Sequence, residues 1–288
     1  MAITTLDGAL AGMKVPQFYY KQNVPAPVAV GKPVSYWYTA GIPGAGAADT
    51  STAYGVARSS SSSLVNGQIP YYDPGGGSNT YLAKFIGYAS QPGVLMLCDR
   101  IWDCGAQSSG TAISITSTSS QTINSNTSGA SNNGGSWYAR DNNGSSNGEG
   151  VLIAVEVSSA TGSGTPTMTM TYTNSAGTGS HTGAYVTSTV ASSPVGQFYP
   201  ITLQAGDTGV RSVQTIQHSA TWSSGQYILV AYRVLAQVEI DVANTAMAVD
   251  CLTSGFVQLY NGTVPFLVYV PSSTTGAYVA GQMIVTQG

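Results

Sequence analysis

Short segments of alternating polar and apolar residues, or of β-branched and aromatic residues, run along the whole chain, and turn residues separate nearly all of them. Successive side chains of a strand point to opposite faces, so this alternation is typical of half-buried strands. Gly, Ser, Asn and Pro between the segments indicate turns. The predicted strands are residues 33–40, 81–90, 94–102, 111–123, 151–159, 167–174, 184–190, 198–204, 210–222, 227–240, 264–271 and 278–287. This series predicts an all-β protein, an antiparallel β-sandwich or jelly-roll-like fold with one or two sandwich subdomains.

Two segments carry helical signals. Residues 4–13, TTLDGALAGM, offer Thr4 or Thr5 as an N-cap, and Pro16 interrupts the pattern soon afterwards. Residues 240–255 place apolar side chains loosely at helical spacing and end in Gly255, a residue common just after helices. We expect a short helix in the first segment. For the second, a helix and a non-helical segment stay equal alternatives.

Residues 1–35 have the composition of an extended N-terminal arm, followed by a β-sandwich region over residues 36–288 that is either continuous or subdivided near residue 150. The stretch QFYYKQNVPAPVAVGKP (17–33) joins three aromatic residues to three prolines, and prolines at this density favour extended chain. An arm lying across a neighbouring subunit would bury Phe18, Tyr19 and Tyr20. An arm folded back on its own domain is the equal alternative.

Charged residues make up only 7% of the chain, against about a quarter in typical soluble proteins, whereas 42% of residues are hydrophobic. Net charge is a main defence against association, so a surface this poor in charge predicts assembly with other copies or with other proteins. The net charge is −3, and the nine Lys and Arg are spread singly along the sequence. Without a basic patch, we expect no direct contact with nucleic acid.

No apolar run approaches the 18 or so residues that a membrane helix needs, so we expect no membrane partner. The first 20 residues lack a basic region followed by an apolar one, which argues against a secretion signal. We therefore expect the protein to be made and assembled in a cytoplasm.

The stretch VLMLCDRIWDC (94–104) is the densest cluster of chemically active side chains. The spacing of Cys98 and Cys104 matches no usual zinc motif, so we expect no metal here. As a strand, the stretch has two faces of mixed polarity, which is typical of a sheet edge or a subunit contact with charges paired across it. Asp99, Arg100 and Trp102 are therefore candidate interface residues.

Two long segments of turn residues, 41–80 and 105–150, interrupt the strand pattern. Loops this long usually serve a function or contact a partner, and a disordered linker is the equally weighted alternative. Trp137 and Tyr138 are the bulky aromatic residues of the second loop and complete the candidate interface.

The sequence offers little for catalysis. His181 and His218 lie in polar, strand-like or turn-like sequence, and no G-x-S-x-G motif is present. His218 on a strand is expected to bind a backbone carbonyl or to face solvent. The carboxylates are scattered, and the glycine clusters lack the Lys and the strand-to-helix frame of a phosphate-binding loop. We therefore expect no enzymatic activity, no catalytic residue and no cofactor.

Several sequence segments of the chain resemble virion proteins of tailed bacteriophages. They are MAITTLDGALAG followed by QFYYK, GIPGAGAA, YLAKFIGYASQPGVLMLCDRIWDCGA, SSNGEGVLIAVEVSSATG with the TYTNSAGTGS hairpin, AGDTGVRSVQTI, and VPFLVYVPSSTTG. Together they span most of the chain. The resemblance implies a structural component of the virion, assembled in the bacterial host's cytoplasm.

Within that class, we expect a capsid decoration or cement protein that binds the major capsid protein or other virion proteins as a homo-oligomer. Analogy with β-rich decoration proteins suggests a trimer. A tail or neck component is the alternative within the class. A glycan-binding module on the virion surface and a hydrolase are the alternatives from other classes.

Overall fold

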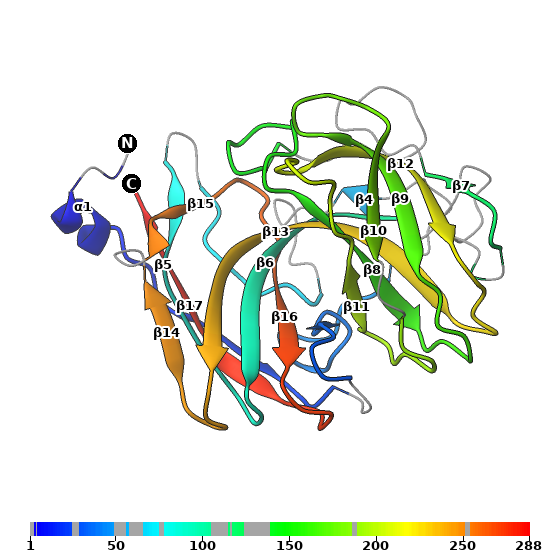
Figure 1. Cartoon of the computed structure of the whole chain (residues 1–288). Coiled ribbons are helices and arrows are strands. Elements are labelled where there is room, and N and C mark those ends of the chain that lie inside the picture. Colours follow the sequence, from blue (N-terminus) through cyan, green and yellow to red (C-terminus); the bar gives the residue numbers. More distant parts are fainter. Residues whose placement is uncertain are drawn as a thin grey trace. The chain divides into compact units, whose positions relative to one another are not determined.

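The computed structural model describes residues 3, 5–24, 29–48, 56–57, 66–74, 78–104, 115, 117–123, 139–185, 189–250 and 254–288, with residues 56 and 57 described by their backbone alone. The chain forms two compact units, and its path alternates between them. Unit 1 comprises residues 1–47, 59–99 and 234–288. Unit 2 comprises residues 48–58 and 100–233. Both units are built almost entirely of antiparallel strands, which confirms the predicted all-β fold (Figure 1).

Two long strands are shared between the units. They are β6 (Gly93–Cys104) and β13 (Gln226–Ile240). Unit 1 also contains α1 (Leu6–Ala11), β1 (Gln17–Lys21), β2 (Val34–Ser35), β3 (Gly41–Ile42), β5 (Thr80–Ala89), β14 (Met247–Asp250), β15 (Val257–Leu259), β16 (Pro265–Pro271) and β17 (Val279–Gln287). Unit 2 also contains β4 (Val56–Ala57), β7 (Gln121–Thr122), β8 (Leu152–Ser159), β9 (Met168–Asn174), β10 (His181–Tyr185), β11 (Phe198–Pro200) and β12 (Val210–His218).

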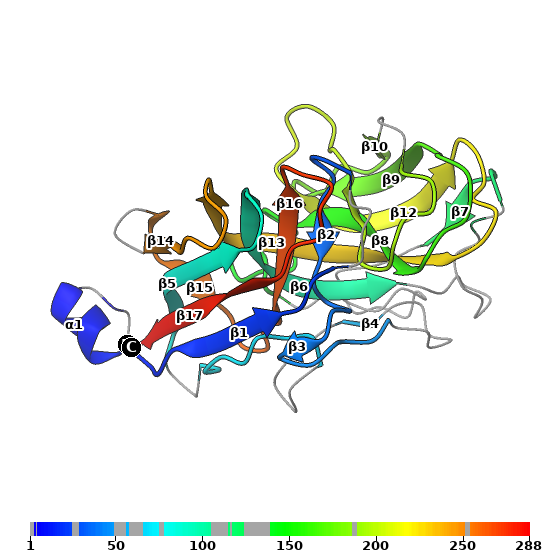
Figure 2. The same cartoon turned by 90° about the horizontal axis from the view of Figure 1, so that it is seen from below.

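Unit 1 is a two-sheet sandwich. One sheet has the order β14-β5-β17-β1-β3, with β15 also pairing β5, and Figure 2 shows β5, β17 and β1 side by side. The other consists of β13, β6, β16 and β2 in that order. Alternate side chains of both sheets form one apolar core, to which β1 contributes Tyr19, β5 contributes Phe85 and β6 contributes Leu97. The period-2 alternation of the sequence therefore corresponds to an inner and an outer face.

Unit 2 packs the sheet β10-β9-β12-β7 against the strands β11, β8, β13 and β6. Its core joins inward side chains from both layers, among them Val155 of β8, Tyr172 of β9, Ile216 of β12 and Leu229 of β13. In β8 the residues from 153 to 157 are buried on both faces. A sequence of mostly apolar residues without strict alternation, as in LIAVEV, is what such a doubly covered strand requires.

The N-terminal segment follows the alternative in which it folds back on its own domain. Helix α1 begins after Thr5, whose hydroxyl accepts a hydrogen bond from the amide of Gly8 at 3.0 Å, as predicted from its capping chemistry. Residues 17–21 then form β1, which pairs with β17 and β3. The Tyr19 hydroxyl donates to the carbonyl of Ile86 at 2.8 Å. Gly281 leaves room for this hydroxyl, since a Cβ there would lie 2.5 Å from it.

The helical alternative for residues 240–255 is wrong over the described residues 240–250. A turn with Asn244 at positive φ reverses the chain, and the Thr245 amide donates to the Val242 carbonyl. Residues 247–250 then pair with β5 as β14. The edge of β5 offers backbone hydrogen bonds to this segment. A short helix with loosely spaced apolar residues would bury too little surface to be more stable than this pairing.

The edge position expected for residues 94–104 is also wrong. Strand β6 lies between β13 and β16, and β4 pairs with its C-terminal end. All its residues from Leu97 to Cys104 are buried. Among the residues that the structure describes, no helix is long and apolar enough to cross a membrane.

Candidate functional site

The structure separates the predicted interface residues into three groups. Phe18 and Tyr20 are exposed, at 63% and 42%, on the outward side of β1, and Tyr19 between them is buried in the core of unit 1. Asp99, Arg100 and Trp102 are fully buried within the chain itself. Trp137 and Tyr138 lie outside the described residues.

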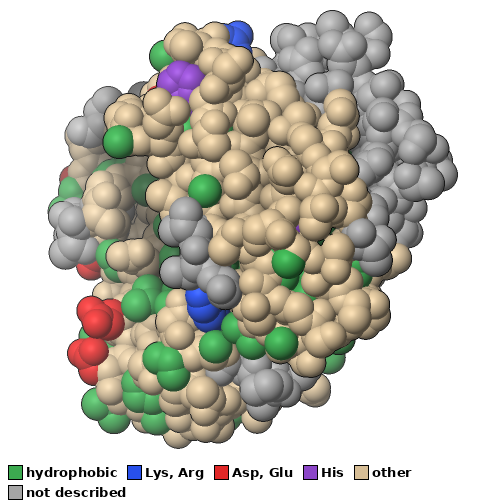
Figure 3. Space-filling model, turned by 45° about the vertical axis from the view of Figure 1, so that its right-hand side comes forward, with side chains coloured by type: hydrophobic (Ala, Val, Ile, Leu, Met, Phe, Trp, Pro, Cys, Tyr) green, Lys and Arg blue, Asp and Glu red, His purple; other side chains and the backbone are tan. Residues whose placement is uncertain are grey.

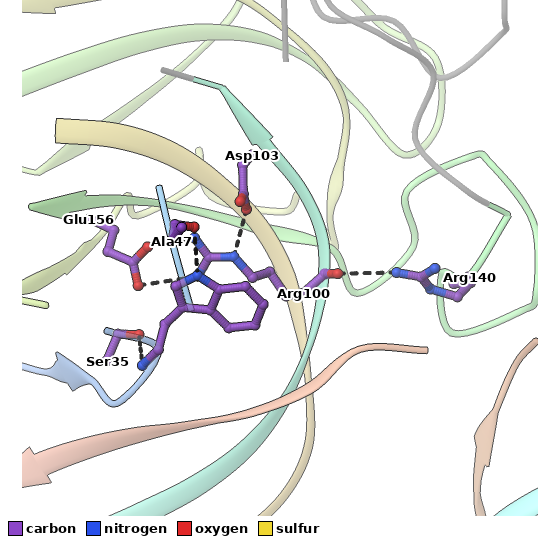
Figure 4. A network of polar contacts seen from close by, with 7 residues as sticks. Ser35, Ala47, Arg100, Asp103, Arg140 and Glu156 are labelled. Carbon is purple, nitrogen blue, oxygen red and sulfur yellow. Dashed lines mark hydrogen bonds and ion pairs between the residues drawn. The ribbon is translucent and has the colours of Figure 1, made fainter. Parts of the chain in front are cut away.

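Arg100 is the centre of a buried ionic network in unit 2 (Figure 4). Its Nε lies 2.6 Å from Asp103 Oδ1, and its two terminal nitrogens lie 3.2 and 2.6 Å from the carboxylate of Glu156 on β8. Arg140 donates a hydrogen bond to the backbone carbonyl of Arg100 at 3.1 Å. The side chains of Arg100, Asp103 and Glu156 have no exposed surface. A buried guanidinium held by two carboxylates fixes β6 against β8 and is closed to a ligand.

The other polar groups of this strand also serve the fold. Asp99 Oδ1 accepts a hydrogen bond from the amide of Val264 at 2.9 Å. Cys98 and Cys104 are buried free thiols, and burial together with the neighbouring Asp99 raises the pKa of Cys98 far above its usual value. A thiol of this kind is a weak nucleophile and a poor metal ligand. Within the described ranges, no three His, Cys, Asp or Glu side chains come close enough to hold a metal ion.

His218 is buried in unit 2, with its Nδ1 3.2 Å from the carbonyl of Ser117 and its Nε2 2.7 Å from the hydroxyl of Tyr227. Burial lowers the pKa of His218, although the hydrogen bond to Ser117 opposes that effect. The neutral ring donates from Nδ1 to the carbonyl and accepts from the Tyr227 hydroxyl at Nε2. The backbone-carbonyl contact expected for this histidine is therefore present.

Among the described residues, the arrangement closest to catalytic geometry lies around Asp207. Its carboxylate accepts hydrogen bonds from Tyr172 and from Asn174 Nδ2, the latter at 2.7 Å, and His181 Nδ1 lies 2.7 Å from Oδ2. The hydrogen bonds from Tyr172, Asn174 and His181 lower the pKa of Asp207. The Tyr172 hydroxyl also accepts from the amide of Gln204 at 2.9 Å. These contacts bind the loop before β12 to the β9–β10 hairpin, so the cluster has a structural role.

The segment from 139 to 150, part of the second long loop, is organised around Asp141. The carboxylate of this residue accepts from the amides of Asn143, Ser145, Gly148 and Glu149 and from the Ser145 hydroxyl, at 2.6 to 3.2 Å. Burial raises the pKa of Asp141, but the hydrogen bonds from Ser145 and the backbone amides outweigh it, so the net direction is down. With its oxygens occupied by N–H and O–H donors, this carboxylate orders the loop.

The exposed apolar surface gathers instead on the outward side of the β14-β5-β17-β1-β3 sheet in unit 1. Paired strands bring outward side chains into rows, because directly opposed residues share a face. The residues of this surface, called the outer sheet face below, are Phe18, Tyr20, Ile42, Lys84, Ile86, Tyr88, Ala248, Asp250, Ala280, Gln282 and Ile284 on the strands, and Leu6, Leu10, Met13 and Phe256 beside them.

Two hollows lie along the outer sheet face. The larger, of about 430 Å³, is lined by residues of β1, β3, β5 and β17, including Phe18, Tyr20 and Ile42. The smaller, of about 180 Å³, lies between α1 and β5 and is lined by Leu6, Leu10, Met13 and Phe256 among others. These seven large apolar side chains are between 40% and 64% exposed.

Charge is scarce on this surface as elsewhere. The outer sheet face carries one cation, Lys84, and one anion, Asp250, which are opposed in the β14–β5 register. On the side of the molecule drawn in Figure 3, positively and negatively charged side chains are few and scattered among polar and backbone atoms. Because the outer sheet face carries one charge of each sign, it depends on shape and apolar contact rather than on charge to recognise a partner.

Comparison with known proteins leaves the family open. No protein-family model matches the chain, and no curated protein matches it. A crystal structure of the infectious bursal disease virus VP2 subviral particle aligns over 94% of this chain and 80% of that chain, with 8% identity and a TM-score of 0.17. A structure of the Gt strain of the same virus aligns over 96% and 82%, with 9% identity and a TM-score of 0.16. TM-scores this low carry no argument about this chain.

Proposed function

We propose that this chain is a non-enzymatic structural protein of a virion. The observation that carries the proposal is the outer sheet face, an exposed apolar surface in a chain with 7% charged residues. Such a surface is unfavourable in water and becomes favourable when a protein partner covers it. The ionic groups described above are occupied within the fold, which suits a protein whose role is to bind and brace.

Within this class, we propose a decoration protein on a tailed-phage head. The resemblance of the quoted segments to tailed-phage virion proteins supports this assignment. A shell repeats one binding surface many times, so modest contacts by each copy add up to a large stabilisation of the particle. The protein would bind as a homo-oligomer to the major capsid protein and strengthen the shell against internal DNA pressure.

The test is binding to empty, expanded capsids of the phage that encodes the chain. The expected result is saturation at a fixed number of copies per capsid protein, with a higher melting temperature of the decorated shell. An unrelated β-sandwich protein at the same concentration is the control. Absence of capsid binding contradicts the decoration assignment. Retention on host polysaccharide without capsid binding would favour the glycan-binding alternative.

A further inference from the structure

We infer that the outer sheet face of unit 1 is the binding surface for a second copy of this chain. The inference rests on the proposed function, because it names the partner that makes the chain a homo-oligomer. Four properties of the outer sheet face support the inference: its continuity, its area, its charge and its shape. All of its residues belong to unit 1.

The two hollows belong to one continuous surface. Lys84, Ile86 and Tyr88 succeed one another at every second position of β5 and share its outward side. Lys84 lines the smaller hollow, whereas Ile86 and Tyr88 line the larger one. A partner that covers β5 therefore covers both hollows, including the exposed side of α1.

The area of this surface matches what a stable dimer needs. A large apolar side chain has about 200 Å² of surface, so seven of them about half exposed present roughly 700 Å². The largest apolar patch of a typical monomer is about 300–600 Å², and a standard interface buries about 800 Å² on each partner. Partly exposed Ile86 and Tyr88 add to the total. The outer sheet face thus exceeds the usual monomer patch and approaches one half of a standard interface.

Charge and relief favour a copy of the same surface as the occupant. The single Lys84 and the single Asp250 leave the outer sheet face without excess charge, so two copies meet without net repulsion. A strongly acidic or basic partner would find no counterpart here. Phe18 is 63% exposed and itself lines the 430 Å³ hollow, so the surface holds a projection and a depression side by side. A twofold axis can place the projection of each copy in the depression of the other.

Face-to-face packing of two sheets is the geometry by which this occurs. Sheets pack about 10 Å apart with interdigitating side chains, as the two sheets within each unit already do. The outward rows Phe18–Gln282–Ile86 and Tyr20–Ala280–Tyr88 supply side chains of unequal size, which such packing requires.

The experiment measures self-association by sedimentation velocity over a range of protein concentrations. The face variants are Phe18→Glu and Tyr20→Glu, whose wild-type side chains are 63% and 42% exposed. The matched controls are Val234→Glu and Tyr72→Glu, both at positions that are 37% exposed. Val234 lies on β13 in the other sheet of unit 1, and Tyr72 is not among the residues that form the face or line its hollows. Gln282→Glu is a further face variant, which adds a charge without changing size and so preserves the fold. Circular dichroism verifies that each variant is folded.

The expected result is a reversible wild-type dimer whose dissociation constant rises at least about tenfold in each face variant and stays unchanged in both controls. Folded face variants that associate as well as the controls overturn the assignment of this surface, while the proposed function stands. A wild-type chain that stays monomeric yet binds capsids overturns the second copy as the occupant. A chain that neither associates nor binds capsids contradicts the proposed function as well.

Discussion

Lys21 shows how this chain uses its few charges at the scale of a residue. Its ammonium group is buried and donates to three backbone carbonyls, those of Thr39, Pro43 and Gly44, at 2.8 to 3.2 Å. Burial lowers the pKa of Lys21 from 10.5 to about 8. Like Arg100 and Asp141, this residue ties separate segments of backbone together. Scarce charges placed inside the fold leave the surface still poorer in charge than the composition suggests.

The lowered pKa of Lys21 predicts a pH dependence of stability. Below about pH 8 the lysine is protonated in both states, and the folded state bears the cost of a buried charge. Between about pH 8 and 10.5 the folded state loses the proton first, so the free energy of unfolding rises with pH. Between pH 7.5 and 9.5, the free energy of unfolding of the wild type should rise by about 1–2 kcal/mol relative to that of Lys21→Met. Urea unfolding of both proteins measures this difference, and parallel pH profiles would contradict it.

The Arg100 network predicts a large cost for removing one carboxylate. Glu156→Gln keeps the size of the side chain but removes the charge of one carboxylate that holds the buried guanidinium, so we expect a loss of about 3 kcal/mol in the free energy of unfolding. Glu239→Gln, the same change at an exposed position of β13, should stay within about 0.5 kcal/mol of the wild type. Chemical denaturation of both variants tests the comparison. Equal effects would mean that the network adds nothing to stability.

At the scale of elements, strands with a clear period were predictable and strands decided by their neighbours were not. Residues 151–159 and 278–287 are strands β8 and β17 nearly as predicted, because local alternation or β-branched content suffices there. Residues 17–21 were not predicted as a strand, because they form one by pairing with the edge of β17 and not through a local sequence pattern. The mixed polarity of β6 suggested an edge because sequence cannot show that Glu156, 56 residues away, neutralises Arg100.

The pairing of β1 with β17 depends on Gly281. A Cβ at this position would lie 1.9 Å from the carbonyl oxygen of Ile86 and 2.5 Å from the Tyr19 hydroxyl. Gly281→Ala should therefore force β5, β17 and β1 apart and lower the free energy of unfolding by about 1–3 kcal/mol. Gly44→Ala, where a Cβ meets nothing within 4 Å, is the control and should be nearly neutral. Thermal unfolding compares the two, and an unperturbed Gly281→Ala would show that the sheet adjusts freely.

At the scale of the whole molecule, the sequence indicates association but not its location. The low charge content and the aromatic run Phe18, Tyr19 and Tyr20 were visible in the sequence, but not which of the three side chains is exposed. The outer sheet face was not, because its rows combine residues from positions near 18, 42, 86, 248 and 282 through registers that only the fold defines. The many charged and cysteine side chains of the CDRIWDC stretch led to an interface prediction on β6. The side chains of this strand from Leu97 onward are buried within the chain.

Hydroxyl-radical footprinting of the wild-type protein at low and high concentration measures whether the outer sheet face becomes covered when the protein associates. Tyr20 on the outer sheet face and Tyr72, which belongs to neither the face nor its hollows, form a matched pair, since they are 42% and 37% exposed in the single chain. If a second copy covers the outer sheet face, modification of Tyr20 should fall several-fold at high concentration while that of Tyr72 stays constant. Equal modification of Tyr20 at both concentrations, in a sample that sedimentation shows to be associated, would contradict it.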